Sequence, residues 1–534
     1  MIPQDFLKAI AAERSVSDSE IEVLSHALAG ETIAAIATNL GIRPEAVRKR
    51  LGEVYKKFHI AGAGPGKMAK LQQILVSKYQ EHQVQMLEEA REKPLSIATT
   101  AKERQDWGEA PDVSIFYGRR SQLDTLKEWI LNQECRLVAI LGMSGIGKTA
   151  LSVKFAHEVS DEFDYLIWRS LRHSPPLKDL LDNILQFLSL RRSTYSITEV
   201  NEKISQLIGY FREHRCLLIL DGVETILKKD SLAGQYREGY ENYGDLFRRL
   251  GEEPHQSSLA IASLEKPKEI GLLEGETTPV RSLLVTDLEE EEAWQIFQAK
   301  GLAEEDKWGE LISLYRGNPL KLKIAASTIR DLFGGQVSEL LKQNTLVFGD
   351  INNLLEQQFE RLSALEREII YWLAIERQPV SMQKLRDNML LPVSQRELLE
   401  ALDSLGRRSL LEQETKPEEA LFSLQPAFME YVTNRIVEGV SAEIREVFRT
   451  KKTEKIVMMR SHALVQLQAD KELQDNQSCY FVVPIKNRLR RMFRSESKIQ
   501  EYLTQIQPLL EGEPALEVGY AMENVRQLLN SHLS

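Results

Sequence analysis

The residues with the clearest chemistry are Gly142 to Thr149, which read GMSGIGKT and satisfy the pattern GxxxxGK[ST]. In such a loop, successive backbone N–H groups and the N-terminus of the next helix form a cradle for phosphate groups. The lysine adds a positive charge on the outer phosphates, and the threonine hydroxyl offers a ligand to Mg²⁺. We therefore predict a phosphate-binding site for a nucleotide, made of Gly142, Met143, Ser144, Gly145, Ile146, Gly147, Lys148, Thr149 and Ala150.

An acidic partner for this loop is expected at Asp221, which directly follows the apolar run Cys216–Leu220. A carboxylate in this position holds Mg²⁺ through its water shell. Glu224 follows shortly after, where a carboxylate can orient or deprotonate the water that attacks a terminal phosphate. We predict catalytic roles for Lys148, Asp221 and Glu224 and metal ligation by Thr149 and Asp221. A solvated loop residue is the alternative reading of Glu224.

The elements around the loop must place it at the end of a buried strand. Residues 136–141 form the apolar run that is typical of a strand in a parallel sheet. After the loop, Leu151, Val153 and Phe155 recur along an amphipathic helix. The sequence therefore predicts a multidomain chain whose core is an α/β P-loop NTPase with a parallel sheet.

Further motifs resemble those of NB-ARC ATPases, the AP-ATPase-like proteins of the STAND signalling class. The likeness covers the chain from about Phe116 to Val440 and is carried by Phe116–Arg119 (FYGR), Phe163–Trp168 (FDYLIW) and Gly317–Leu320 (GNPL). It is similar to the cyanobacterial branch in the segment 234–244. The resemblance implies ATP or ADP as ligand with Mg²⁺, bound also by Tyr117, Gly118, Arg119 and Pro319. Pro319 and the backbone of Tyr117 and Gly118 would flank the adenine.

Three departures from the pattern of this family bear on mechanism. Relatives read TSREKP where this chain has Ser263-Leu264-Glu265-Lys266-Pro267, and their arginine senses the terminal phosphate. Because a charge-assisted hydrogen bond contributes about 1.5–3 kcal/mol, Leu264 predicts weaker discrimination of ATP from ADP. Gln425 stands where a histidine of the MHD motif holds ADP, so it is the predicted nucleotide contact from that motif. Gly222 replaces a second acid and predicts slow hydrolysis.

The changes of pattern along the chain predict six segments. Residues 94–114 lack periodicity and read as a linker, and the lid and winged-helix assignments follow from the NB-ARC resemblance. The predicted organisation is an all-α N-terminal helix-turn-helix domain (1–93), a linker (94–114), the P-loop domain (115–285), a helical lid of the ARC type (286–350), a winged-helix domain (351–440) and a helical C-terminal region (441–534).

The N-terminal segment resembles LuxR-type helix-turn-helix domains from Ser17 to Ile60. Residues 1–40 are net acidic and residues 41–70 net basic. A recognition helix would present Arg48, Lys49 and Lys56 to DNA. Basic residues on a small bundle are often only a solvated face, and related modules bind protein instead. Contact with DNA therefore stays one of two alternatives.

Composition excludes several other classes. The net charge is −11, with 43% hydrophobic and 28% charged residues, which indicates a globular protein without a nucleic-acid coat. Cys135, Cys216 and Cys479 lack the spacing of a disulfide framework or zinc site. No run of about 20 apolar residues and no apolar signal core occurs, so we expect a cytoplasmic protein without a membrane partner.

These observations favour a signalling switch driven by exchange of ATP for ADP and slow ATP hydrolysis, which controls domain arrangement or assembly and regulates transcription through the N-terminal domain. The alternative is an adaptor that holds ADP constitutively, binds DNA or protein and has negligible ATPase activity. The sequence shows no repeat of the WD type. Self-assembly or an unknown protein partner is expected for the switch.

Overall fold

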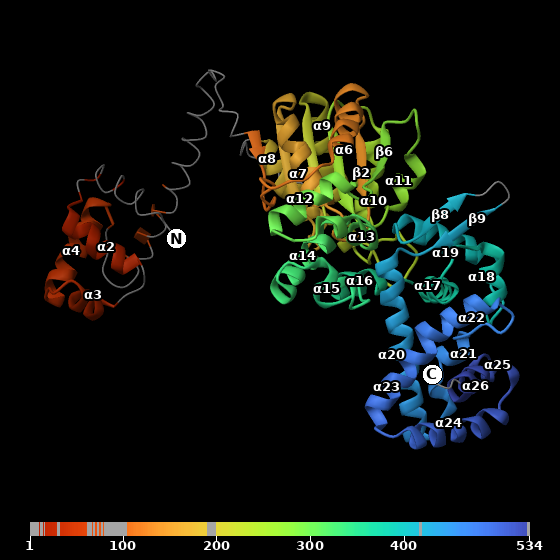
Figure 1. Cartoon of the computed structure of the whole chain (residues 1–534). Helices are drawn as coiled ribbons and strands as arrows, with labels where there is room; N and C mark the ends of the chain where they lie inside the picture. Colours follow the sequence, from red (N-terminus) through yellow and green to blue (C-terminus); the bar gives the residue numbers. More distant parts are fainter. Residues whose placement is uncertain are drawn as a thin grey trace. The chain divides into compact units, whose positions relative to one another are not determined.

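A computed structural model of the chain describes residues 16–28, 32–60, 104–189, 199–415 and 419–530, together with single positions between 10 and 78. The chain separates into two units, Met1–Thr99 and Thr100–Ser534. Each unit is described by itself (Figure 1). Among the described residues, every helix is too short or too polar to span a bilayer.

The described part of the first unit contains helices α2 (Asp18–Leu28), α3 (Ile33–Asn39) and α4 (Pro44–Lys57). The Thr32 hydroxyl accepts a hydrogen bond from the N–H of Ala35 and so caps α3, and Pro44 stands in the first turn of α4, where no N–H is needed. Buried Val47 and Val54 hold α4 against its neighbours. These three helices lie within Ser17–Ile60, the stretch that resembles LuxR-type helix-turn-helix domains, and the helix-turn-helix assignment stays a prediction.

The core of the second unit is a six-stranded parallel sheet in the order β1-β3-β4-β5-β2-β6. Its strands are β1 (Gln105–Asp106), β2 (Leu137–Leu141), β3 (Tyr165–Ser170), β4 (Cys216–Asp221), β5 (Ser258–Ser263) and β6 (Val280–Leu284). Strand β5 lies between β2 and β4, so the loops that follow these three strands meet at one edge of the sheet. The predicted parallel-sheet P-loop core is confirmed.

Helices cover both faces of this sheet, because side chains of each strand alternate between the faces. Val138 and Ile140 of β2 pack with α6 (Arg120–Lys127) and α7 (Lys148–Val159). Leu137, Ala139 and Leu141 pack on the other face. The helices of that face are α8 (Leu177–Leu188), α9 (Val200–Glu213), α10 (Asn242–Glu252) and α11 (Lys268–Leu273).

The prediction of a linker through residue 114 is wrong in its last part. Gln105 and Asp106 form β1 and pair with Leu166 and Ile167 of β3. Asp106 also forms an ion pair with Arg169. A strand of two residues leaves no periodicity in the sequence, which is why the segment read as a linker. Residues 94–103 lie outside the described residues.

Two further segments follow the sheet along the chain. The lid segment contains α12 (Glu290–Lys300), α13 (Trp308–Leu314), α14 (Pro319–Phe333) and α15 (Val337–Leu341). The next segment combines α16 (Gly349–Phe359), α17 (Ala364–Glu376), α18 (Met382–Asn388) and α19 (Gln395–Arg407) with an antiparallel sheet in the order β7-β9-β8. Its strands are β7 (Val380–Ser381), β8 (Glu412–Thr415) and β9 (Ala420–Ser423). This arrangement is that expected of a winged helix, and that assignment stays a proposal.

Helix α20 (Pro426–Thr450) runs through the predicted domain boundary at residue 440 (Figure 1). At 1.5 Å per residue, its 25 residues extend about 37 Å, and they lead into the C-terminal bundle. The bundle consists of α21 (Met458–Ser461), α22 (Lys471–Gln477), α23 (Val483–Phe493), α24 (Glu496–Glu511), α25 (Ala515–Val518) and α26 (Ala521–Asn530).

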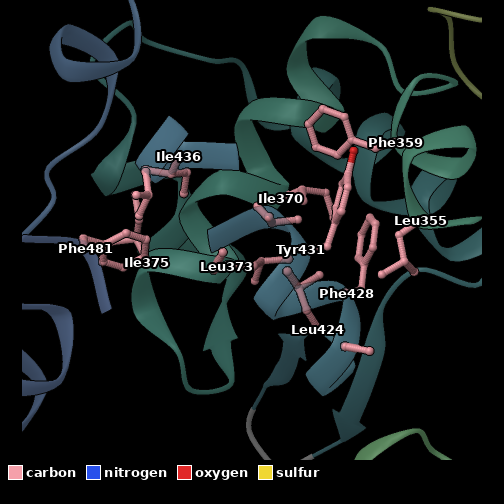
Figure 2. Packing of buried hydrophobic residues seen from close by; sticks show 14 of the residues in the cluster. Leu355, Phe359, Ile370, Leu373, Ile375, Leu424, Phe428, Tyr431, Ile436 and Phe481 are labelled. Atoms are coloured by element: carbon pink, nitrogen blue, oxygen red, sulfur yellow. The ribbon is translucent and has the colours of Figure 1, made fainter. Parts of the chain in front are cut away.

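One hydrophobic cluster joins the lid, the winged-helix segment and the C-terminal bundle. Figure 2 shows its centre, where Tyr431 of α20 lies between Phe359 and Phe428. Ile375 and Phe481 extend the same packing toward the bundle. Because apolar contacts run without a break through this core, we expect the winged-helix segment and the bundle to move as one body.

Candidate nucleotide-binding site

The phosphate loop lies between β2 and α7, as its sequence predicts. The Lys148 ammonium donates to the carbonyl oxygens of Gly142 and Met143, both at 2.9 Å. Burial lowers the pKa of Lys148 to about 8, while the carboxylates of Glu224 and Asp221 act in the opposite direction. Gly147 has a φ of +102°, and a Cβ there would meet no atom within 4 Å. The loop thus presents an open backbone surface and a half-buried cation, which together fit a phosphate group.

Asp221, at the end of β4, faces Thr149 in the first turn of α7. The Thr149 hydroxyl donates to Asp221 Oδ1 at 2.7 Å. Burial raises the pKa of Asp221, although this hydrogen bond lowers it. A hydroxyl and a carboxylate at this separation fit Mg²⁺, which takes few protein oxygens and completes its shell with phosphate and water. Thr149 and Asp221 would hold the metal, which supplies charge neutralisation on the phosphates when bound.

Glu224 is half-buried and lies in a short helical turn after β4. Its Oε2 accepts a hydrogen bond from the backbone N–H of Leu264 at 3.2 Å. Glu224 therefore has a fixed neighbour beyond β5, which argues against the reading as a freely solvated residue. Its role in activating water stays a prediction.

A second pocket, of about 140 Å³, adjoins the phosphate loop and has the apolar lining that a purine ring requires. It is lined by Ile115, Phe116, Tyr117, Arg119, Gly145, Ile146, Gly147, Ala150, Leu288, Pro319, Leu320 and Lys323. The Lys323 ammonium lies 5.6 Å from the centre of the Tyr117 ring. Tyr117 and Arg119 thus meet Pro319, which is far from them in sequence, at one site.

The start of α14 contacts the phosphate loop directly. Asn318 donates from Nδ2 to the carbonyl oxygen of Ser144 at 3.1 Å, and the N–H of Leu320 donates to that of Gly145 at 3.2 Å. A Cβ at Gly145 would lie 2.8 Å from Leu320 Cβ. Glycine at this position is therefore required by the approach of the lid as well as by its φ of +78°.

Residues 119–237 match the NB-ARC domain. An uncharacterized WD repeat-containing protein of Nostoc sp. is 43% identical over 464 residues, which are 80% of this chain and 37% of that protein. The disease resistance protein RPV1 of Vitis rotundifolia is 24% identical over 266 residues, which are 47% of this chain and 18% of that protein. The chain thus spans well under half the length of these relatives. The NB-ARC match supports a nucleotide-binding P-loop NTPase.

Solved structures with partial likeness include two archaeal ATPases. A Walker-type ATPase of Pyrococcus abyssi is 15% identical with a TM-score of 0.41, over 61% of this chain and 99% of that one. A STAND protein with a tetratricopeptide repeat sensor from Pyrococcus horikoshii is 17% identical with a TM-score of 0.32, over 79% of this chain and 59% of that one. Neither likeness supports an inference about function.

Within the NB-ARC segment, Arg119 also connects the phosphate loop to the segment that follows β6, and its contact with nucleotide stays a prediction. Its guanidinium donates to the carbonyl oxygens of Ile146 at 3.0 Å and Asp287 at 3.3 Å, and to that of Thr286. Its backbone N–H donates to Glu292 Oε1 at 2.9 Å. Because these bonds use the charged end of the side chain, Arg119 ties the phosphate loop to the start of the lid and borders the pocket with the rest of its surface.

Gln425 is not among the described residues that line the pocket. It is half-buried at the N-terminus of α20, where its carbonyl oxygen accepts from the N–H of Met429 at 2.8 Å. Its neighbour Leu424 is buried in the large hydrophobic cluster. The contact of Gln425 with nucleotide stays a prediction.

Proposed function

We propose that the protein is a nucleotide-operated switch. In this switch, replacement of bound ADP by ATP and slow hydrolysis of the ATP set the position of the winged-helix segment. The observation that carries this proposal is the segment Ser263–Pro267 after β5. Its Leu264 N–H contacts Glu224 in the nucleotide site. The next side chain, Glu265, contacts the winged-helix segment. Two adjacent residues thus connect the site of hydrolysis to the element that would move.

The contact with the winged-helix segment is a buried cluster of charges. Glu265 is only 1% exposed, and its carboxylate accepts from Arg361 Nε at 3.1 Å. Arg408 Nη1 lies 2.7 Å from Glu265 Oε2, and Arg408 Nε lies 3.1 Å from Glu366 Oε1. Ser404 donates to the same Glu366 oxygen at 2.6 Å. Every charge in this cluster has an opposite charge beside it, and Glu265 is the member that joins the segment after β5 to the winged-helix segment.

The energies involved suit a switch. Shifting an equilibrium between two states from 1:99 to 99:1 takes about 5.5 kcal/mol of differential binding. Removing one partner of a buried ion pair costs about 3–5 kcal/mol, because a charge is left without compensation. A movement that left Glu265 or one of its arginines buried without its partner would therefore change the interface energy by an amount comparable to what the switch requires.

Hydrogen exchange of the whole protein tests the proposed movement. We expect backbone amides near Glu265 and Arg408 to exchange faster with Mg²⁺ and a non-hydrolysable ATP analogue than with Mg²⁺ and ADP. Mass spectrometry of peptic fragments measures the difference, and the Lys148→Ala variant, which should bind neither nucleotide, is expected to lose it. Identical exchange in the two nucleotide states of the native protein would contradict the switch. Identical exchange would favour the alternative, an adaptor that holds ADP constitutively. That alternative would be excluded if the native protein hydrolysed ATP at a rate well above that of Lys148→Ala.

A second proposal concerns DNA and rests on the exposed face of α4. Arg48, Lys49 and Lys56 are exposed there, opposite buried Val47 and Val54. If this face binds DNA phosphates, replacing Arg48 and Lys49 by alanine should reduce the salt dependence of affinity, by about 0.9 in the log–log slope for each phosphate that is no longer neutralised. Fluorescence anisotropy with a random-sequence duplex measures this slope. Arg120→Ala, at an exposed position on α6, is the control. An unchanged slope in the α4 variant would contradict the DNA proposal. Binding of a protein partner or self-assembly would then be the role of this domain.

A further inference from the structure

The loop after β3 brings an arginine to the metal side of the nucleotide site. Arg172 lies two residues beyond the end of β3 and is 68% exposed in its side chain. Its Nη2 lies 3.8 Å from Asp221 Oδ2, while Asp221 Oδ1 accepts from Thr149. The carboxylate expected to hold Mg²⁺ therefore has the phosphate loop on one side and an exposed guanidinium on the other.

The loop that carries Arg172 is held in place from several directions. Leu171 donates its N–H to the carbonyl oxygen of Asp221 at 2.7 Å. The hydroxyls of Tyr240 and Tyr243 donate to the carbonyl oxygens of Ser174 at 2.7 Å and Pro175 at 2.9 Å. Both tyrosines belong to the segment 234–244, which is similar in sequence to the cyanobacterial NB-ARC proteins. That segment fixes the backbone beside Arg172, while the guanidinium stays exposed.

The residues at positions 222 and 264, which depart from the pattern of the family, both favour a phosphate-binding role for Arg172. A Cβ at Gly222 would lie in van der Waals contact with Arg172, 3.4 Å from its Cγ, so position 222 directly adjoins the arginine stem. The missing second acid at position 222 also removes a carboxylate that would hold the guanidinium by charge attraction. On the other side, Leu264 offers only its backbone N–H, which Glu224 accepts. The site thus lacks a cation at 264 and has an exposed one at 172.

We propose that Arg172 recognises the terminal phosphate of ATP, in the role that relatives assign to the arginine at the position of Leu264. The inference rests on the proposed nucleotide switch and assigns the residue that tells its two nucleotides apart. If Thr149 and Asp221 hold Mg²⁺, the metal would neutralise the carboxylate that Arg172 faces, and the guanidinium would be available to a phosphate bound beside it. ADP lacks this phosphate. Arg172 therefore contributes to the affinity for ATP and contributes little to that for ADP.

Calorimetric titration of nucleotide-free protein with Mg²⁺ and either ADP or a non-hydrolysable ATP analogue tests this assignment. Arg172→Gln is expected to weaken binding of the analogue by about 10- to 150-fold, the range for one charge-assisted hydrogen bond. Its ADP affinity should stay within about threefold of the native value, which also shows that the variant is folded. Arg120→Gln, at an exposed arginine paired with Asp124 on α6, is the matched control and should change neither affinity.

The double variant Arg172→Gln/Leu264→Arg separates sensing from a structural effect. We expect it to regain preference for the ATP analogue, because a guanidinium returns to the same phosphate from the other side. Equal losses of both nucleotides in Arg172→Gln, or no loss of either, would overturn the assignment and leave the switch standing. If the native protein binds neither nucleotide, the switch itself fails along with the role of Arg172.

Discussion

Replacing Lys148 by alanine is expected to remove bound nucleotide from the purified protein. The Lys148 ammonium is half-buried and lies within reach of the phosphate cradle. Without it, less positive charge would oppose the carboxylates of Asp221 and Glu224 beside the phosphates. Removing one charge-assisted hydrogen bond to a phosphate is expected to weaken affinity by about 10- to 150-fold. Denaturing freshly purified protein and quantifying the released ADP and ATP by chromatography measures the effect.

The identity of the released nucleotide distinguishes the resting states. Near-stoichiometric ADP in the native protein, absent from Lys148→Ala, would establish a resting ADP state. Bound ATP would indicate weak hydrolysis, as Leu264 and Gly222 predict. Lys154→Ala is the matched control, because Lys154 stands on the same helix and pairs with Glu158. Equal nucleotide content in Lys148→Ala and in the native protein would contradict the predicted site.

The local part of this site was predictable from sequence, because a strand, a loop and a helix that follow one another need no long-range information. The meeting of Thr149 with Asp221 was also predictable, since parallel strands bring their carboxyl ends to one edge of a sheet. Leu264 shows the limit of this reasoning. Its side chain has no donor, which predicted weaker discrimination of ATP from ADP, and nothing in the sequence indicated that its backbone N–H donates to Glu224. A sequence pattern describes side chains, and it leaves such backbone hydrogen bonds out.

Contacts between distant segments were the least predictable. Arg361 and Arg408 read as ordinary surface charges in the sequence, and only the packing of the winged-helix segment on the sheet buries them against Glu265. The predicted domain boundary at residue 440 does not coincide with the end of a helix, for a simpler reason. Val440, Ile444 and Val447 continue the buried stripe of α20, so the helix extends past it. The helical periodicity of these residues is visible in the sequence, but the basic clusters that begin nearby suggested a new segment.

The same buried charges give the second large effect, which we expect from replacing Glu265 by glutamine. This change keeps the shape of the side chain and removes its charge, so Arg361 and Arg408 lose a common partner in a buried place. Breaking a buried ion pair in this way costs about 3–5 kcal/mol. If ADP is retained while Glu265 contacts Arg361 and Arg408, the variant should release a fluorescent ADP analogue at least about 100-fold faster than the native protein in a stopped-flow chase.

The control for this experiment is Glu360→Gln, which removes a charge from an exposed side chain directly beside Arg361 in sequence. It should leave the release rate unchanged. Combining Glu265→Gln with Arg408→Gln should give less than the sum of the two single effects, since both residues belong to one cluster. Additive effects, or release at the native rate in Glu265→Gln, would mean that the cluster stabilises the fold without controlling the nucleotide. Non-additive acceleration would instead identify Glu265 as the residue through which the winged-helix segment and the nucleotide site affect each other.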